Sequence, residues 1–518
     1  MRKIKLYSIL SIFAVIFSAC ESDYLDTVPS ATVSTATVFE NTNNAKMALN
    51  GIARLMVSQH LSTQSMCGEG SIKFFFGEYT GENFSRPARA SSLYLAMNGD
   101  YHENSAHIYS YFPWYYYYML LGNVNVFLAN IDNAEGPASE KQFLKAQALT
   151  YRAYCYTQLV QFYCYRWDDS NNGTSLTQLM DGLVLRTEEH LEDTDIPLSS
   201  SGEVYKLIYS DLDEAISLYE TSGLSRSKVW EPNINVAHAV YARAAITRQD
   251  YSKAAEMAPK ARQGHALMSN ADYTSGFSSE NSEWIWGSYG APDQTLFFYG
   301  FHSYMAYDAG SSIIRGFPVC ISRRLYDKIP ATDIRKDMFL DPGEHEYSNS
   351  NGVVVDPEFA TEVRSKYPTM TAAHNVAAYM SFKFRIGGSV GIGYINHFRS
   401  AEMILIEAEA KYFNNDEAGA QALLNELIRD SKRDEAYECT ATGTALLDEI
   451  KTYRSIELWG EGFDWLDKKR YNEPITRISL ADGDSFGSAA AVNRPVDYGN
   501  RWTYVTPLIE RENNKAWN

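Results

Sequence analysis

Residues 235–266 read NVAHAVYARAAITRQDYSKAAEMAPKARQGHA, and residues 401–430 read AEMILIEAEAKYFNNDEAGAQALLNELIRD. Both stretches place small or apolar residues at the same intervals of 12, 4 and 3: Ala242, Ala254, Ala258 and Ala261 in the first, and Ala408, Ala420, Leu424 and Leu427 in the second. This alternation is typical of a tetratricopeptide-like unit, in which small residues let the two helices of a hairpin approach closely. The spacing favours two hairpins of one repeat type over two unrelated alanine-rich hairpins.

Helical patterns also occur on the N-terminal side of these hairpins, and they begin after Asn41. Residues 137–166 repeat apolar side chains at i, i+3, i+4 and i+7, which predicts one long amphipathic helix. Ser139, with Glu140 beside it, is expected to start that helix. The four consecutive tyrosines at 115–118 cover a full helical turn, so they cannot all be buried or all exposed.

The sequence between the two hairpins has a different character. Residues 268–320 and 340–395 are rich in Gly, Ser, Tyr and Asp, with only short strand-like runs at 284–286 and 382–385. Loops this long are uncommon in a compact protein and are usually functional. We therefore predict a mostly α-helical, tetratricopeptide-like scaffold that carries a large irregular insertion with short strands.

A single domain is expected from residue 41 to residue 518. Its helical scaffold would span about 41–267 and 396–475, and the loop-rich, ligand-binding insertion about 268–395. A C-terminal extension would occupy 476–518.

The N-terminus predicts an exported lipoprotein. Three positive charges in residues 1–5 precede an apolar run that is shorter than the ~20 residues of a transmembrane helix, as in a secretory signal. The run ends in Phe-Ser-Ala-Cys20, which resembles a bacterial lipobox; an ordinary cleavage site beside an incidental cysteine is the alternative. We expect residues 1–19 to be a signal peptide, Cys20 to carry the lipid, and the Ser/Thr-rich residues 20–40 to form a tether.

Composition excludes several classes of protein. With 518 residues, 45% hydrophobic and 21% charged, the chain is neither mainly disordered nor fibrous. Its net charge is −18, and −21 without the signal peptide and its Arg2, Lys3 and Lys5, so a surface that binds nucleic acid is not expected. Five scattered cysteines besides Cys20 predict small buried thiols and not a disulfide framework.

Local signatures of catalysis and of cofactor binding are missing. His102 and His107 are five residues apart, so a helix would not present both to one zinc ion. A stretch that begins like a calcium loop at Asp168 has Leu179 where the bidentate Glu is needed. Neither a phosphate-binding loop nor a nucleophile elbow occurs. The sequence predicts no enzyme, no cofactor and no metal site.

Several motifs resemble those of the SusD/RagB family, the surface glycan-binding lipoproteins of Bacteroidetes-like bacteria. CESDYLD at 20–26, followed by Pro29, is similar to the opening of the mature family members. WYYYYMLLGNVN at 114–125 is similar to the family's W-x-x-x-Y-x-x-I-x-x-x-N helix. KAQA at 145–148 is similar to part of its L-R-A-x-A-Y helix.

The most specific resemblance is YRSIELWGEGFDWLDKKR at 453–470, which we call the signature segment. It is similar to E-R-x-x-E-L-x-x-E-G-x-R-x-x-D-L-x-R, with Tyr453 and Asp464 as the two departures. TPLIE at 506–510 is similar to the family's terminal motif, so the resemblance covers the whole mature chain.

The signature segment itself is interpreted as a packing element. Arg454, Glu457 and Glu461 lie at i, i+3 and i+7, so these charges are expected to pair with one another. The rings of Trp459 and Trp465 would pack beside them. We therefore do not expect ligand contacts from this segment.

The resemblance implies a function and a location. It implies a non-catalytic lipoprotein that captures oligosaccharides and delivers them to a SusC-like TonB-dependent transporter of the outer membrane. The protein would be lipid-anchored in the outer membrane and face the extracellular side.

Sugar binding makes specific demands on side chains. A sugar ring has an apolar face and a rim of hydroxyls, so its site needs an exposed aromatic ring with amide or charged groups nearby. Residues 72–101 and 284–308 supply both, and the resemblance places the ligand-binding loops at roughly these positions. The predicted ligand-binding residues lie among loop formers: Tyr79, Asn83, Arg86, Tyr94, Tyr289, Tyr299 and Tyr304. Core packing is expected instead for Phe74–Phe76, Trp286, Phe297 and Phe298.

Three rival functions remain open on the sequence alone. The same fold could capture peptides, the protein could be a surface hydrolase, or it could be a tetratricopeptide adaptor for other proteins. The sequence does not identify a glycan ligand, because stacking on an aromatic ring tolerates many sugars.

Overall fold

The computed structural model describes residues 35–517 except for 62–65, 88–92, 168–172, 290–299, 311 and 387–391. The predicted signal peptide, Cys20, the calcium-loop-like start at Asp168 and Tyr299 lie outside the described residues. The fold is mostly α-helical. None of the helices in the described part combines the length and apolar character needed to cross a bilayer.

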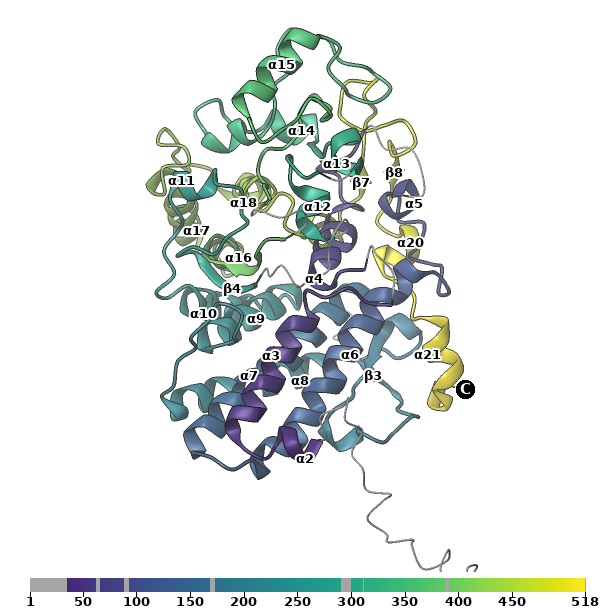
Figure 1. Ribbon diagram of the computed structural model, residues 1–518, viewed down its shortest axis with the longest axis vertical. Coiled ribbons are helices and arrows are strands. Elements are labelled where there is room, and N and C mark those ends of the chain that lie inside the picture. Colours follow the sequence, from purple (N-terminus) through teal and green to yellow (C-terminus); the bar gives the residue numbers. More distant parts are fainter. Residues whose placement is uncertain are drawn as a thin grey trace, which may run out of the picture.

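A helical scaffold makes up the lower and middle parts of the molecule in Figure 1. Its helices are α2 (Thr35–Val38), α3 (Thr42–Leu55), α6 (Ile108–Asn130), α7 (Ala138–Tyr163), α8 (Ser201–Ser222), α9 (Ile234–Thr247), α10 (Tyr251–Ala261), α16 (Ser400–Phe413), α17 (Glu417–Asn425), α18 (Gly443–Glu457) and α19 (Asp464–Tyr471). After α17 the chain continues as a π-helical turn, Glu426–Asp430.

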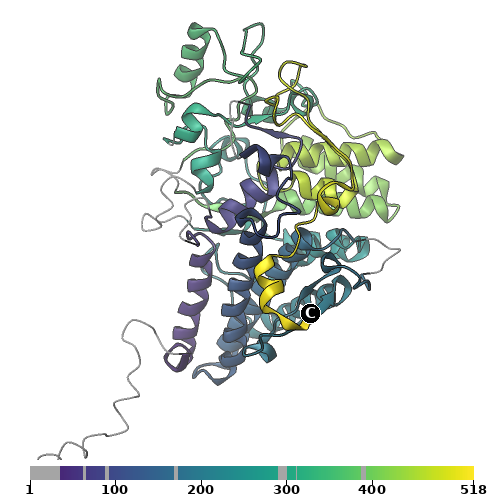
Figure 2. The same ribbon diagram turned by 90° about the vertical axis from the view of Figure 1, so that its right-hand side faces the viewer.

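The two predicted hairpins are confirmed as α9–α10 and α16–α17. Asn233 and Asp250 cap α9 and α10 by accepting backbone N–H bonds from Val236 and Lys253. All eight residues of the repeated spacing are buried, which lets the helices of each hairpin pack closely. Helix α10 packs in turn against α16, so hairpins from distant parts of the chain form one layer (Figure 2).

The expected start of α7 is wrong, whereas the expectation for the four tyrosines is confirmed. Helix α7 begins at Ala138, after Pro137 at the N-cap, and Ser139 lies inside it without capping it. The expected tether contains one helical turn, α2. Of the four tyrosines, Tyr116 and Tyr117 are fully buried and Tyr115 and Tyr118 are half-buried, as a helical turn requires.

The region between the hairpins forms the upper part of Figure 1 and is less irregular than the sequence suggests. It contains α11 (Asn270–Tyr273), α12 (Phe301–Met305), α13 (Ser312–Gly316), α14 (Arg323–Tyr326) and α15 (Pro357–Lys366). Helix α15 was not expected; Asp356 caps it and Pro357 occupies its first position. The strand-like run 382–385 forms no strand, because Lys383 points into the core and is held there by ion pairing.

Four two-stranded antiparallel sheets complete the fold, with no larger sheet among the described residues. They are β1 (Phe84–Ser85) with β5 (Cys320–Ile321), β2 (Gly182–Val184) with β3 (Leu198–Ser200), β4 (Trp284–Ser288) with β6 (Ile395–Arg399), and β7 (Ile475–Thr476) with β8 (Asn493–Arg494). Beyond β8 lie α20 (Tyr498–Trp502) and α21 (Leu508–Asn513). Helix α21 returns to the scaffold, where Trp114 Nε1 of α6 donates to Glu510 at 3.3 Å.

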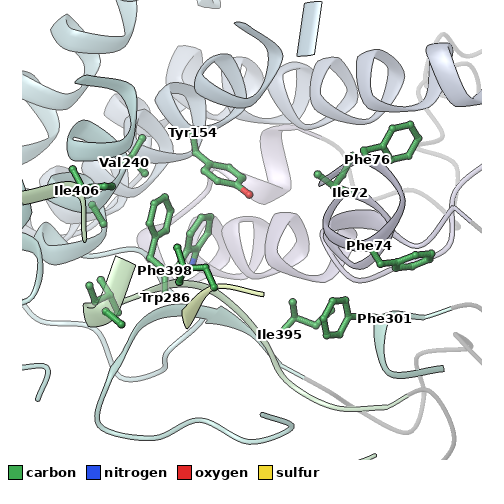
Figure 3. Packing of buried hydrophobic residues seen from close by; sticks show 14 of the residues in the cluster. Ile72, Phe74, Phe76, Tyr154, Val240, Trp286, Phe301, Ile395, Phe398 and Ile406 are labelled. Carbon is green, nitrogen blue, oxygen red and sulfur yellow. The ribbon is translucent and has the colours of Figure 1, made fainter. Parts of the chain in front are cut away.

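The β4–β6 pair joins the insertion to the scaffold core. Figure 3 shows Trp286 and Phe398 side by side below Tyr154 of α7, with Val240 of α9 and Ile406 of α16 close by. The Trp286 and Phe398 rings stack with their centroids 6.2 Å apart, and Tyr154 meets Trp286 edge-on at 4.9 Å. The five cysteines of the described chain are buried, as predicted.

A buried ion-pair network, which we call the Arg399 network, lies beside this sheet. Arg399 Nη1 contacts Glu283 at 2.8 Å and Glu457 at 2.7 Å, and its Nη2 contacts Glu461 at 2.8 Å. Lys383 Nζ reaches Glu461 at 2.7 Å. All of these side chains are at most 2% exposed. Burial alone would raise the pKa of Glu457, but Arg399 and the other cations hold it down at about 2.

Arg454, Glu457 and Glu461 therefore do not pair with one another as expected. Glu457 and Glu461 pair with residues of the insertion and of β6, while Arg454 Nε contacts Asp467 of α19 at 2.6 Å. The reason is burial, because Glu457 and Glu461 face the core, where only cations from distant segments can reach them.

Residues 68–86 lie against the other side of the signature segment. They include α4 (Gly68–Ser71), a π-helical stretch (Ile72–Glu78) and β1. A Cβ on Gly77 would lie 2.4 Å from the Cα of Gly462, so this close crossing requires glycine. Lys73 Nζ donates to the Glu461 carbonyl at 2.9 Å.

Two carboxyl groups, buried Glu78 and half-buried Asp464, meet at this crossing. Glu78 Oε1 accepts the backbone N–H groups of Gly462 and Phe463, and its other oxygen has no partner. Burial, together with the negative charge of Asp464, raises the pKa of Glu78 well above its usual value. Burial likewise raises the pKa of Asp464, to about 6.

Replacement of Glu461 by Gln should lower the free energy of unfolding by about 3–5 kcal/mol, because it leaves buried Arg399 and Lys383 short of one negative charge. Urea unfolding at pH 7 measures this change. Glu256→Gln is the matched control, because Glu256 is largely exposed and pairs only with surface lysines. Equal losses in the two variants would contradict a dominant role for the Arg399 network.

The Glu78–Asp464 pair predicts a pH dependence of stability. Both folded-state pKa values are raised, so the folded protein binds more protons than the unfolded chain above about pH 4, and the free energy of unfolding falls as the pH rises. For Asp464 this fall is complete above about pH 6, and for Glu78 it continues to higher pH. Glu78→Gln should flatten the fall, as measured by urea unfolding between pH 5 and pH 8. The exposed-site control Glu135→Gln should leave the wild-type slope unchanged, and a Glu78→Gln profile parallel to the wild type would refute the assignment.

Candidate functional site

Three of the predicted ligand-binding residues are brought together, but inside the protein. Tyr79 is fully buried, Arg86 is 1% exposed and Tyr304 is 3% exposed. The Arg86 guanidinium lies 5.8 Å from the Tyr79 ring centroid and 5.5 Å from that of Tyr304, and its Nη2 donates to the Tyr304 carbonyl. Tyr304 also stacks on Phe74 at 4.4 Å.

The expectation that these three side chains stand exposed on loops is therefore wrong. Each ring has an aromatic neighbour on the face that a sugar would need, since Tyr79 stacks on Phe84 at 5.1 Å and Tyr304 on Phe74. Tyr79 lies next to a π-helical stretch and Tyr304 in the short helix α12, so both rings are held by regular structure and not by open loops. As predicted, Phe74, Phe75, Phe76 and Trp286 belong to the core.

Asn83 and Tyr94 occupy partly accessible positions. Asn83 is half-buried, and its backbone N–H and side-chain amide donate to the two carboxylate oxygens of Asp464 at 2.7 and 2.8 Å. This contact explains the acid at position 464, where the family pattern has a basic residue. Tyr94, in α5 (Leu93–Met97), is half-buried and packs against the hydrophobic core.

Tyr289 is the predicted residue whose surroundings best suit an exposed ligand. It follows β4, is half-buried and is not packed against the main hydrophobic core. Its ring lies 4.8 Å from that of Trp230, which is also half-buried, and the ring planes are inclined by 47°. Lys228 Nζ, on an exposed side chain, lies 5.7 Å from the Trp230 ring. We call these rings the Trp230–Tyr289 pair.

The backbone beneath this pair is firmly held. Arg226 Nη1 donates to the carbonyl of Ile285 in β4 at 2.6 Å, and also to the carbonyls of Val229 and Glu231 in its own loop. The Trp230 carbonyl accepts a bond from Trp286 Nε1 at 3.1 Å. The loop and β4 are therefore joined by hydrogen bonds to the backbone beneath the two rings.

A second aromatic pair lies on α6. Tyr111 and Tyr115 are half-buried, are not packed against the main core, and have ring centroids 5.6 Å apart. Helix α3 connects the two pairs, because Lys46 of α3 pairs with Glu231 next to Trp230, and His60, which follows α3, lies 6.4 Å from Tyr115. Figure 1 shows α3 lying across the front of the scaffold beside α6.

This arrangement can bind a ligand with apolar faces and hydroxyl groups. The aromatic pairs offer flat apolar surfaces, and the ammonium groups of Lys228 and Lys46 can donate hydrogen bonds beside the first pair. Sequence reasoning missed Trp230, Tyr111 and Tyr115. The signal for Trp230 was a lone tryptophan in the polar loop SGLSRSKVWEP, which no helical or strand period accounts for.

The chain also lacks an obvious centre for metal chemistry in its described part, where no three His, Cys, Asp or Glu side chains cluster to hold an ion. His102 and His107 lie in different surroundings. His102 is buried, which lowers its pKa to about 4, and His107 stacks on Tyr101 at 3.8 Å.

Comparison with solved structures gives the same fold. A SusD-like carbohydrate-binding protein from Bacteroides vulgatus has 22% sequence identity and a TM-score of 0.73, over 92% of this chain and 97% of that one. A SusD superfamily protein from Bacteroides thetaiotaomicron has 19% identity and a TM-score of 0.70, over 92% and 98% of the two chains. One from Bacteroides fragilis has 20% identity and a TM-score of 0.69, over 93% and 100%. No curated protein matches the chain.

Family models match both ends of the sequence. The SusD family model matches residues 338–515, which include the signature segment. A SusD-like model described as "starch-binding associating with outer membrane" matches residues 23–246. Because the two matches together cover most of the sequence, and the fold agrees, the chain belongs to the SusD/RagB family.

Proposed function

We propose that this protein is a non-catalytic lipoprotein of the outer-membrane surface that captures oligosaccharides and delivers them to a SusC-like TonB-dependent transporter. Membership of the SusD/RagB family is the observation that carries this proposal, because it is a family of binding proteins and not of enzymes. One structural relative is named as a carbohydrate-binding protein, and one family model is named for starch binding and outer-membrane association.

The two aromatic pairs near α3 provide the proposed contacts. A pyranose ring would lie against the Trp230–Tyr289 pair, whose rings are half-buried and lie 4.8 Å apart. The Tyr111–Tyr115 pair would meet a further part of a longer chain. Tyr94, also half-buried, stays a proposed contact, whereas Asn83 is already bonded to Asp464.

The expected affinity follows from the number of contacts. One aromatic stack contributes about 0.5–1.5 kcal/mol beyond burial, so two stacks and a few hydrogen bonds give a Kd of roughly micromolar to millimolar for one site. Weak capture suits a protein that must release its ligand to a transporter. A polysaccharide that meets several pairs at once would bind more tightly.

The proposed anchor is the lipid on Cys20, which follows the signal peptide of residues 1–19. A lipoprotein with two or three acyl chains stays attached to a membrane without spanning it, since each buried methylene contributes about 0.8 kcal/mol. Residues 20–40 would then separate the fold from the membrane surface, facing the cell exterior.

Trp230→Ala and Tyr289→Ala should each weaken binding of a recognised oligosaccharide by roughly 2- to 10-fold, because each removes one stacking surface. Calorimetry on residues 21–518 against plant, fungal and host polysaccharides measures this. Phe413→Ala is the matched control, because Phe413 is 38% exposed and stacks on Tyr251 at 4.2 Å, away from the proposed site.

Two results would count against the glycan site. Unchanged affinity in both variants would move the site away from the Trp230–Tyr289 pair. Binding of peptides with no binding of any polysaccharide would replace glycan capture by peptide capture on the same fold.

Cys20→Ala should move the full-length protein from the membrane fraction to the soluble fraction, because it removes the acylated residue. Fractionation followed by mass spectrometry of the N-terminal peptide measures both the location and the lipid. An unmodified Cys20 in membrane-bound wild-type protein would contradict the anchor.

A further inference from the structure

A small cavity lies within the helical scaffold, where α7, α8, α9, α18 and α19 meet. Its volume is about 40 Å³, which is room for two or three water molecules. The wall includes Phe463 and Leu466 on its apolar side, and Trp167. This cavity is separate from the aromatic pairs of the proposed glycan site, none of whose rings lines it.

Cations dominate the charged part of the wall. Arg166, Arg243, Arg454, Lys469 and Arg470 all line the cavity, whereas Asp467 is the one acid on the described wall. Three of these cations have carboxylate partners: Arg243 pairs with Glu402, Arg454 with Asp467, and Arg470 with Glu409.

Lys469 differs from these three paired cations. Its Nζ donates to the carbonyls of Gln161 and Cys164, at 2.7 Å each, and no carboxylate of the described residues lies within ion-pairing distance. The residue is 6% exposed. When Lys469 is protonated, its charge on the wall is therefore paired with no carboxylate of the described residues, and burial lowers the Lys469 pKa to about 7.

Arg454 also has an unused hydrogen-bond donor. Its Nε contacts Asp467, but its Nη1 is buried and has no hydrogen-bond partner, and the residue is 4% exposed. The Phe463 ring centroid lies 5.1 Å from the Arg454 guanidinium and 5.2 Å from that of Arg243, so the guanidinium groups are held at the cavity by an aromatic ring as well as by ion pairs.

We propose that this cavity is a binding site for one small monovalent anion, either a halide or a short carboxylate such as formate, held by Arg454 and Lys469. Water could accept the free hydrogen bonds, but it would leave the buried charge of Lys469 without a counter-ion. An anion would accept these hydrogen bonds and also balance the positive charge. The volume of the cavity limits this anion to a few non-hydrogen atoms. The bound anion would stabilise the contact of α18 and α19 with α7 and α9.

The first experiment locates the ion. Crystals of residues 21–518 grown in sodium bromide should show an anomalous peak for bromine beside Arg454 and Lys469, and the peak should be absent from Arg454→Met crystals. A cavity that contains only water in the wild type, or a peak of equal height in Arg454→Met, would overturn the proposal.

The second experiment measures the effect of the anion on stability. At constant ionic strength near pH 6, thermal unfolding of the wild type should occur on the order of 2–4 °C higher in chloride or formate than in gluconate, which is too large for the cavity. The separate chloride and formate series distinguish a halide from a carboxylate ligand. Lys469→Met and the cavity-filling variant Thr247→Leu should lose this difference.

Arg323→Met is the control for general salt effects, because Arg323 is a surface residue that pairs with exposed Asp327. The Arg323→Met variant should keep the full difference in Tm between chloride and gluconate. A wild type with the same Tm in all three salts would also overturn the proposal, and both experiments read out independently of glycan binding.

Discussion

The contact of Arg399 with three buried glutamates is the interaction on which the rest of the structure depends. Arg399 ends β6, Glu283 directly precedes β4, and Glu457 and Glu461 belong to the signature segment. One guanidinium thus joins the β4–β6 sheet to the C-terminal helices of the scaffold. Because all four side chains are buried, no water can replace a missing partner, and the segments must assemble in one register.

Further cations extend this constraint to the rest of the fold. Lys383 binds Glu461 from the insertion, and Arg335 binds Glu457 at 2.9 Å from the segment before α15. Lys73 reaches the Glu461 carbonyl from the N-terminal third. Three distant parts of the chain are therefore fixed against the eighteen residues of the signature segment.

Features set by residues close together in the sequence could be predicted, whereas contacts between distant residues could not. The hairpins α9–α10 and α16–α17 could be predicted because Ala242 and its equivalents follow a helical period, which is a local property. The partners of Glu457 could not be predicted, because Arg399 lies 58 residues away and the local helical spacing predicted Arg454 instead. Similarly, Tyr79 has the composition of a loop residue, but Phe75 and Phe84 enclose its ring in the folded protein.

The backbone beneath the proposed glycan site is held by the same contacts between the scaffold and the β4–β6 sheet. Trp230 comes from the scaffold and Tyr289 from the end of β4, so a sugar bound to both would lie across the junction of the two regions. Arg226 and the Trp286–Trp230 hydrogen bond hold that junction from one side, and the Arg399 network holds β4 through β6 from the other. Because the backbone beneath the rings is held before a ligand arrives, little ordering entropy of the main chain would oppose binding. Weak affinity at this site would then reflect the small number of contacts and not a cost of rearrangement, which is what rapid capture and release require.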